Sequence, residues 1–407
     1  MRIVCVGGGP AGLYFAILAK LRDPRHEVAV MERNPAGATH GWGVVFWDAL
    51  LDDLYRNDRV SADEMRKASV LYEGQEVRLR DAPTAYLGGY GFSVSRRSML
   101  EVLTARAQDL GVDVQFEREV TDLSELGDVD LLVASDGVNS PIRERYADDF
   151  GTDVAVGRNK YIWLGTTKVF DAFTFAFEET SAGWIWFHAY PSASGNSTCI
   201  VECTPQTWSA LGLDTLGGVE GVARLEQIFA RHLGGHALLN RAHGMGETHW
   251  LSFREIINRT WYRGNIVLMG DAAHTTHFTI GSGTKLAMRD AIALGDLLPA
   301  DAADLPPRLR YFDESGRATL RATQDAAHKS MTWFENLDGK IDDDPVQFAY
   351  ALWKRRGNYP RWRYQLHLAT QIGTLRRVRR EVSSARRSLR ARKRGELGRV
   401  PAGWARR

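Results

Sequence analysis

The sequence predicts an α/β protein with a Rossmann-like dinucleotide-binding domain, an inserted antiparallel β-sheet domain and a helical C-terminal region. Three observations support this fold class. A glycine-rich turn joins a buried strand to a helix at the N-terminus, the same strand-then-turn pattern returns twice, and a run of short strands lies between these repeats. The length of 407 residues exceeds that of a usual single domain, so more than one core is expected.

The N-terminal segment has the spacing of a complete βαβ unit. An apolar run at residues 2–6 leads into the turn GGGPAG, a helix is predicted over residues 13–22, and a second apolar run ends in Glu32. Gly7 makes the tight turn of this motif, Gly9 lets a pyrophosphate approach the backbone, and Gly12 lets the helix pack closely on the strand. The helix N-terminus offers N–H groups to phosphates, and Glu32 accepts the hydroxyls of an unphosphorylated ribose, which favours FAD or NAD over NADP.

Two further strands end in turns that are typical of cofactor sites. The apolar run at residues 130–134 is followed by Asp136 and Gly137, and the run at residues 265–269 is followed by Gly270 and Asp271. Beyond the second turn, the segment Gly281-Ser282-Gly283-Thr284 precedes a helix predicted over residues 286–298. Its backbone N–H groups are open to a flat ring or a phosphate. The sequence therefore predicts cofactor contacts from each of these turns.

Residues 158–202 are predicted to form a meander of short strands separated by turn residues. In the strand GWIWFHAY, alternation places Trp184, Trp186, His188 and Tyr190 on one face and apolar residues on the other. Trp and Tyr are good strand formers, so packing within the sheet is the simpler role for each of them alone. As a group they predict one wall of a pocket.

These signals are interleaved along the chain, which predicts discontinuous domains. The dinucleotide-binding domain takes residues 1–60, 90–157 and 262–300, and the β-sheet domain takes residues 61–89 and 158–261. The helical region takes residues 301–407, with a helix predicted over 308–333.

Composition places the chain among ordinary globular proteins, with 44% hydrophobic and 25% charged residues. Three cysteines are too few for a disulfide framework, and none has zinc-finger spacing to other ligands, so no metal site is expected. No uninterrupted apolar window of about 18 residues occurs, and no cleavable leader precedes the first glycine-rich turn. We therefore expect a cytoplasmic protein without a membrane partner.

The net charge of +2 hides an uneven distribution. Thirteen Lys/Arg and two Asp/Glu follow Thr374, so the C-terminal segment carries +11 and the rest of the chain −9. No nucleic-acid partner is expected, because the arginines are not interleaved with aromatic residues and no RNA-binding motif is present. Two interpretations stay open: a solvated basic tail, or a tail that attracts an anionic ligand.

Taken in order, GGGPAG, ASDGVNSPIR and LMGDAAH resemble the three motifs of the single-component FAD-dependent aromatic hydroxylases, the p-hydroxybenzoate hydroxylase-like monooxygenases. The resemblance covers about residues 1–300. It implies that FAD is the resident cofactor, that NADH or NADPH visits as reductant, and that a flavin C4a-hydroperoxide hydroxylates an electron-rich aromatic ring. It also implies that the Arg of an R-x-x-L helix start, here Arg97, contacts FAD.

Segments such as HGWGVVFWD, GRNKYIWLGTTKVFDAF and HFTIGSGTKLAM look more specifically like the salicylyl-CoA 5-hydroxylases and anthraniloyl-CoA monooxygenases of this family. The violacein-pathway tryptophan hydroxylase looks like a sister group. This resemblance implies a small-molecule substrate, salicylyl-CoA or a related aromatic acyl-CoA, and a monomer or homodimer. A tryptophan or indole hydroxylase is the alternative enzyme, and a non-catalytic flavin-binding protein is the alternative of another class.

The residue assignments complete the prediction. His277, His188 and Tyr190 are candidate proton acceptors, and His277 is the first choice because it lies in the turn expected to face the flavin. Arg376, Arg377, Arg379 and Arg380 are candidate contacts for the three phosphates of coenzyme A. The predicted cofactor-binding residues are Gly7, Gly9, Pro10, Ala11, Gly12, Glu32, Arg33, Gly43, Arg97, Asp136, Gly137, Gly270, Asp271, Gly281, Ser282, Gly283 and Thr284, and the predicted substrate contacts are Trp42, Trp186, His188, Tyr190 and Phe278.

Overall fold

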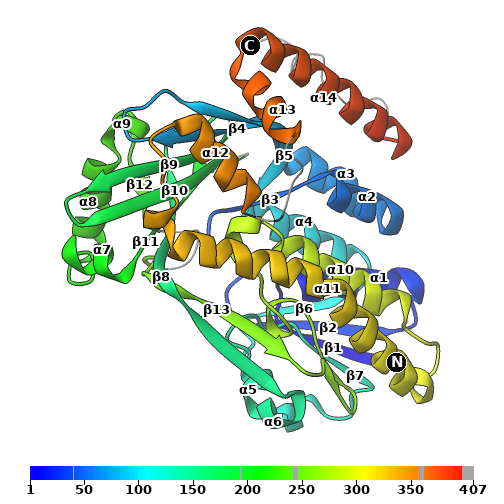
Figure 1. Cartoon of the computed structure of the whole chain (residues 1–407). Coiled ribbons are helices and arrows are strands. Elements are labelled where there is room, and N and C mark those ends of the chain that lie inside the picture. Colours follow the sequence, from blue (N-terminus) through cyan, green and yellow to red (C-terminus); the bar gives the residue numbers. More distant parts are fainter. Residues whose placement is uncertain (40, 193–194, 242–245, 356, 358–361, 397–407) are drawn as a thin grey trace.

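A computed structural model shows two β-sheets with helices packed against both of them (Figure 1). It describes residues 1–407 except 40, 193–194, 242–245, 356, 358–361 and 397–407. The mixed sheets and the helical C-terminal region confirm the predicted α/β class. No helix within the described residues is both long enough and apolar enough to cross a membrane.

The first sheet has six strands in the order β14-β15-β7-β1-β2-β6, and every neighbouring pair except β14–β15 is parallel. Parallel strands end at one edge of a sheet, so the turns after β1, β2, β7 and β15 all meet there. The strands are β1 Arg2–Val6, β2 Glu27–Glu32, β6 Asp113–Phe116, β7 Leu131–Ala134, β14 Tyr262–Arg263 and β15 Ile266–Leu268.

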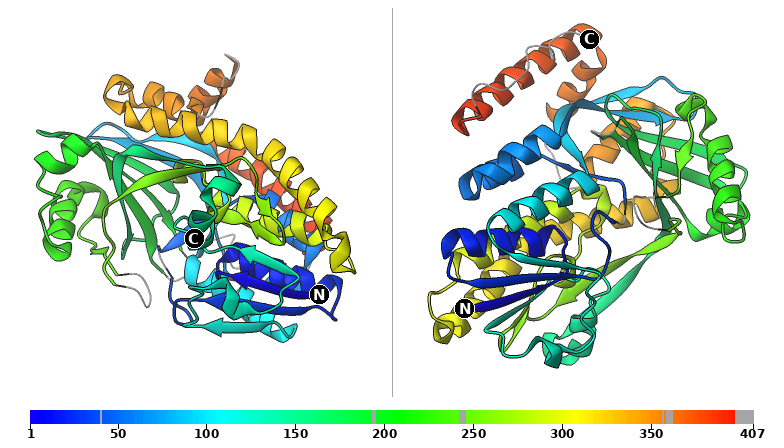
Figure 2. Two further views of the ribbon diagram at one scale, coloured as in Figure 1. Left: turned by 90° about the horizontal axis from the view of Figure 1, so that it is seen from below. Right: turned by 180° about the vertical axis from the view of Figure 1, so that it is seen from behind.

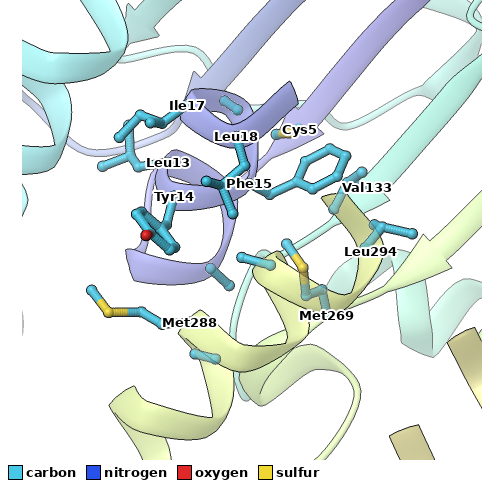
Figure 3. Close-up of a cluster of buried hydrophobic side chains, with 14 of the residues drawn as sticks. Cys5, Leu13, Tyr14, Phe15, Ile17, Leu18, Val133, Met269, Met288 and Leu294 are labelled. Atoms are coloured by element: carbon cyan, nitrogen blue, oxygen red, sulfur yellow. The ribbon is translucent and has the colours of Figure 1, made fainter. Parts of the chain in front are cut away.

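Helix α1 (Pro10–Arg22) holds the glycine-rich turn in place. It is buried on nearly every side, which explains why its sequence is apolar all round. Figure 3 shows Leu13 and Phe15 of α1 in one apolar cluster with Cys5 of β1 and with Leu294 of α10 (Gly283–Asp296). The other helices near the first sheet are α2 Asp48–Asn57, α3 Arg59–Ala68, α4 Arg96–Asp109, α5 Pro141–Arg145 and α6 Ala147–Phe150.

The second sheet has nine strands and is antiparallel apart from the β4–β9 pair. Its order is β12-β8-β11-β10-β9-β4-β5-β3, and β13 pairs with β8. The strands are β3 Gly43–Phe46, β4 Val70–Leu79, β5 Ala85–Ser95, β8 Thr152–Thr166, β9 Phe173–Thr180, β10 Gly183–Pro191, β11 Ser197–Cys203, β12 Leu238–Leu239 and β13 Leu251–Asn258.

The second sheet extends beyond the segments that the sequence analysis assigned to it. Strand β3 belongs to this sheet, because Gly43–Phe46 pairs with the end of β5. Strand β5 continues to Ser95, and β8 begins at Thr152. Gly43 of β3 pairs with Ser95, and Thr152 at the start of β8 pairs with Asn258 of β13, and local patterns do not reveal such distant pairs.

The two faces of β10 differ as predicted. Phe187 lies in an apolar core with Leu225 and Phe229. These two residues belong to a segment that contains three helices, α7 Pro205–Ala210, α8 Gly218–Ile228 and α9 Ala230–Leu233. On the opposite face, Trp186 packs against Phe334 in a second core. Helix α11 (Leu305–Glu335) contributes to this core with its C-terminal end and to the core of the first sheet with its N-terminal half. It thereby ties the two sheets together (Figure 2).

The basic C-terminal segment is docked on the acidic body of the protein. After α12 (Pro345–Lys354) and α13 (Trp362–Gln371), helix α14 (Gly373–Lys393) runs along β5 and leads to Arg394. The Arg394 guanidinium contacts Asp48 at 2.8 Å and Asp52 at 2.9 Å, and the side chains of Arg394 and Asp48 are only 5% and 3% exposed. Part of the uneven charge is thus neutralised within the fold, whereas most of the other basic side chains of α14 are exposed.

Replacing Arg394 by alanine should undock this segment. The change leaves the buried Asp48 carboxylate without its strongest partner, and breaking a buried ion pair in this way costs about 3 kcal/mol in the free energy of unfolding. Chemical denaturation measures the loss. The matched control is Arg392→Ala, which removes the same charge from an exposed position two residues earlier and should cost less than about 0.5 kcal/mol. Equal effects of the two variants would contradict the docking.

Candidate active site

The glycine-rich turn after β1 is packed directly on the end of β7. Gly7 has a φ of +104°, and a Cβ there would overlap the backbone of Ser135. A Cβ on Gly12 would overlap the Gly7 carbonyl and the Ser135 hydroxyl, which itself donates to Gly7 O at 2.9 Å. The space beside Gly9 is open. The contacts therefore agree with the predicted roles of the three glycines, and Pro10 and Ala11 form the first buried turn of α1.

Glu32 ends β2 beside this turn. Its Oε2 accepts a hydrogen bond from Gly8 N at 2.7 Å, and its Oε1 accepts from Asn34 N at 2.9 Å. The carboxylate is therefore held at the strand-end edge, where its other lone pairs can accept hydroxyl groups. Arg33, the next residue, is exposed.

Asp271 lies at the same edge, after β15. Its side chain is accessible to solvent, yet burial raises the pKa of its carboxyl against the opposing charges of Arg96 and His274. A side chain that is accessible and also surrounded by protein lines a recess. We call the space bordered by Gly9, Gly137, Asp271 and Gly283 the strand-end recess. Gly9, Gly137 and Gly283 each have open space where a Cβ would stand.

Arg96, not Arg97, points to this recess. Burial lowers the pKa of Arg96, the charges of Asp271 and Glu32 oppose this effect, and its Nε has no hydrogen-bond partner among the described residues. Arg97 is exposed and pairs with Glu101 at 2.7 Å. Arg96 is therefore better placed than Arg97 for the cofactor contact that the resemblance implies. Helical residues turn by about 100° each, so only one of two adjacent arginines at a helix start can face the recess.

The turn after β15 is fixed by a buried carboxylate. Asp290 of α10 accepts hydrogen bonds from Gly270 N at 3.0 Å and from His274 Nε2 at 2.9 Å. Burial opposes the charged form of His274, but the charges of Asp290 and Asp271 outweigh burial and raise its pKa. His274 thus supports the turn and does not face a ligand.

Asp136 and Gly137 follow β7 at the same edge. Burial raises the pKa of Asp136. The nearby Arg143 is completely buried and donates to Val138 O at 2.8 Å and to Ala272 O at 3.2 Å. Arg143 therefore links the turns that follow β7 and β15.

A second set of predicted cofactor contacts lies where the two sheets meet. Gly281 has a φ of +63°, and a Cβ there would press on Val45 of β3 and on Trp47, so the segment 281–284 lies against β3. Ser282 is held by a 2.9 Å hydrogen bond with Thr276. Gly43 at the start of β3 accepts a hydrogen bond from the Tyr190 hydroxyl at 2.7 Å through its carbonyl. Trp42 packs over Gly165 of β8.

One face of the second sheet supplies aromatic rings beside this junction. In the register of β8, β11, β10 and β9, Tyr161, Glu202, Trp186 and Phe177 form one row, and Trp163, Ile200, His188 and Phe175 form the next. We call this surface the aromatic face. Phe278 lies on it, with ring centroids 4.8 Å from Tyr161 and 5.9 Å from His188. Trp186 lies deeper, stacked on Phe334 at 5.7 Å.

His277 is buried beside Phe278, but its protonation does not suit the predicted role. Its Nδ1 shares a 2.8 Å hydrogen bond with the Thr279 hydroxyl. Burial, together with the charge of Arg355, lowers the pKa of His277 to about 3. The imidazole is therefore neutral at pH 7 and too weak a base for efficient proton transfer there. The structure argues against His277 as proton acceptor and places it in the support of the turn.

Glu202 is a buried carboxyl that the sequence analysis did not single out. It accepts hydrogen bonds from Asn159 Nδ2 at 2.8 Å and from Trp186 Nε1 at 3.1 Å. Burial raises its pKa to about 7, although the two hydrogen bonds oppose the shift. A single acidic residue within the fully buried strand β11 was the signal that could have identified it.

The residues present fit a bound FAD. The open glycine turns can take phosphates, Glu32 and Asp271 can accept hydroxyls, and the unpaired Nε of Arg96 can donate to the cofactor. The segment 281–284 and β3 can border a flat ring next to the aromatic face. Arg33 and Arg97 are predicted contacts with exposed side chains, and Arg97 pairs with Glu101.

Comparison with known proteins agrees with this geometry. Residues 90–303 match the family described as "FAD binding domain". The chain is 38% identical to a salicyloyl-CoA 5-hydroxylase of a Streptomyces species, covering 86% of this chain and 69% of that protein. It is 35% identical to 3-hydroxy-4-methyl-anthranilyl-[aryl-carrier protein] 5-monooxygenase of Streptosporangium sibiricum (89% and 96% covered) and 29% identical to protodeoxyviolaceinate monooxygenase of Chromobacterium violaceum (88% and 96%).

Among solved structures, p-nitrophenol 4-monooxygenase PnpA of Pseudomonas putida DLL-E4 has the same fold. Its TM-score is 0.68 at 17% sequence identity, with 95% of this chain and 98% of that chain covered.

Exchanging Arg96 for glutamine should weaken FAD binding. The variant loses the only charged donor that faces the recess from α4, and a hydrogen bond to a charged group contributes enough that the Kd for FAD should rise at least about tenfold. Fluorescence titration of the apoprotein measures this change. Arg97→Gln is the control and should change Kd by less than about threefold, because Arg97 forms only an exposed ion pair. A larger effect of Arg97→Gln would restore the original assignment.

Glu202 should make stability depend on pH. A carboxyl whose folded pKa is raised from 4.5 to about 7 stabilises the fold below pH 4.5 and loses that contribution as the pH rises to 7. The free energy of unfolding of the wild type, relative to Glu202→Gln, should therefore fall by about 3 kcal/mol over this interval. Urea denaturation at several pH values measures the difference. The exposed Glu179→Gln is the control, and a flat difference for Glu202→Gln would contradict the shifted pKa.

Proposed function

Because the chain belongs to the FAD-dependent aromatic monooxygenases, we propose that it hydroxylates the ring of an aromatic acyl thioester, salicylyl-CoA or a related 2-substituted benzoyl thioester. NADH or NADPH supplies two electrons. One atom of O2 enters the ring as a hydroxyl group, and the other leaves as water.

The aromatic face next to the strand-end recess carries this proposal. Phe278 contacts both Tyr161 and His188 there; His188 is buried, and Tyr161 and Phe278 are partly buried. Such a surface favours a flat, apolar ring. The relatives with 38% and 35% identity are named for a CoA thioester and for an aryl-carrier protein, and this supports a thioester as the group attached to the ring.

The chain's own residues bind and orient the reactants. The turn 7–12, Glu32, Arg96 and Asp271 would hold the dinucleotide, and the segment 281–284 would border the ring system. When bound and reduced, FAD supplies the activation of O2 that the protein's side chains cannot provide. The buried aromatic face excludes water from the place where oxygen transfer occurs.

The polar groups near the aromatic face hold its side chains in position more than they transfer protons. Glu202 orients Trp186 and Asn159 through two hydrogen bonds. His277 holds Thr279, whose hydroxyl shares a 2.8 Å hydrogen bond with Ser330 of α11. These contacts fix the turn that carries Phe278 against the sheet.

Steady-state turnover tests the proposal. The purified protein should be yellow, and salicylyl-CoA should stimulate both NAD(P)H oxidation and O2 uptake and yield a product heavier by one oxygen atom. Free salicylate should stimulate much less, since it lacks the thioester. Stimulation by tryptophan but not by the thioester would replace this function with the alternative one, and a flavin-loaded protein that turns over neither substrate would support a non-catalytic flavoprotein.

A further inference from the structure

We propose that a pocket between α14 and the β4–β5 hairpin binds phosphate on the group that carries the thioester, either coenzyme A or the phosphopantetheine of a carrier protein. This inference rests on the proposed function and names the part of the substrate that the aromatic face does not explain. The pocket is open to solvent on one side and has a cavity volume of about 60 Å³. Arg376, Arg379 and Arg380 of α14 line one side, and Gln75, Tyr86 and Ala172 line the other.

Two guanidinium groups in this pocket form no ion pair with a carboxylate of the described residues. The carboxylates in its wall are already paired: Glu73 contacts Arg387 at 2.9 Å and Arg380 at 3.7 Å, and Glu76 contacts Arg78 at 2.8 Å. Within the described part of the chain, neither Arg376 nor Arg379 forms an ion pair. The pocket therefore keeps an excess of positive charge after its internal pairs are formed.

The geometry of Arg376 and Arg379 suits a phosphate ligand. The Arg376 guanidinium lies 3.6 Å from the centroid of the Tyr86 ring, and its NH1 is buried without a hydrogen-bond partner among the described residues. Arg379 donates to the Thr370 hydroxyl at 2.6 Å, and burial lowers its pKa. A buried donor without an acceptor is costly, and a phosphate oxygen would satisfy it with a charge-assisted hydrogen bond.

A chain of neighbouring residues leads from the pocket to the residues that border the predicted flavin position. Gln75 pairs with Phe173 in the β4–β9 register, and Ala172 precedes Phe173. The Phe173 ring stacks on Tyr190 at 5.3 Å, and Tyr190 donates to the carbonyl of Gly43 on β3. The register of β4 and β5 also shifts between Glu73 and Gln75, which loosens the sheet at this place. A narrow pantetheine arm that enters here would lead from the arginines toward the aromatic face.

Coenzyme A and a carrier protein both present this arm, so the test uses both. The variant Arg376→Gln/Arg379→Gln is compared with Arg377→Gln/Arg392→Gln, which removes the same charge from exposed positions on the same helix outside the pocket. KM is measured at low salt for the same acyl group on coenzyme A, on a carrier protein and on pantetheine, which lacks phosphate. Calorimetry measures the Kd of free coenzyme A for both variants.

The pocket variant should raise KM for the acyl-CoA about tenfold or more and leave KM for the acyl-pantetheine unchanged, while the control variant changes neither. A rise in KM for both phosphate-bearing substrates assigns the site to the phosphate nearest the pantetheine. A rise in KM for acyl-CoA alone assigns the site to the adenosine phosphates.

Unchanged KM values, or an equal rise for acyl-pantetheine, would overturn the phosphate site while wild-type turnover of the thioester still supports the proposed function. If the wild type turns over no thioester, the proposed function fails, and this inference fails with it.

Discussion

The close packing of the Gly7–Gly12 turn on Ser135 is the constraint on which the rest of the site depends. It brings the end of β1 against the end of β7, and Ser135 fastens them by donating to the Gly7 carbonyl. Any side chain at Gly7 or Gly12 would force these strand ends apart. With them in place, the carboxylates of Glu32 and Asp271 and the guanidinium of Arg96 lie close enough for their charges to interact around one recess.

The second sheet then determines what the recess can do. Strand β3 pairs with β5, and Gly281 packs against β3, so the third cofactor turn lies at the boundary of the two sheets. Tyr190 joins this boundary to the aromatic face through its hydrogen bond to Gly43. The proposed sites for the dinucleotide and for the aromatic ring are thus adjacent, although their residues come from segments far apart in the sequence.

Much of this arrangement follows from local sequence patterns, and the exceptions share a physical cause. The glycine turn, Glu32, Asp271 and the two faces of β10 were predictable, because spacing along one strand or turn determines them. Arg96 was not singled out, because the choice between adjacent helical arginines depends on the angle at which α4 meets the recess. His277 was overvalued, since its pKa depends on burial and on Arg355, which lies seventy-eight positions later. The docking of the basic segment on Asp48 likewise depends on long-range contacts.

In the proposed function, FAD and an aromatic thioester meet where β3, the segment 281–284 and the aromatic face come together. A crystal structure of the FAD-loaded protein with a bound aromatic acyl-CoA tests it most directly. We predict density for the flavin ring between β3 and residues 281–284, with Arg96 donating to the cofactor and the substrate ring beside Phe278. Flavin density elsewhere, or an Arg96 that contacts neither cofactor nor substrate, would contradict the account.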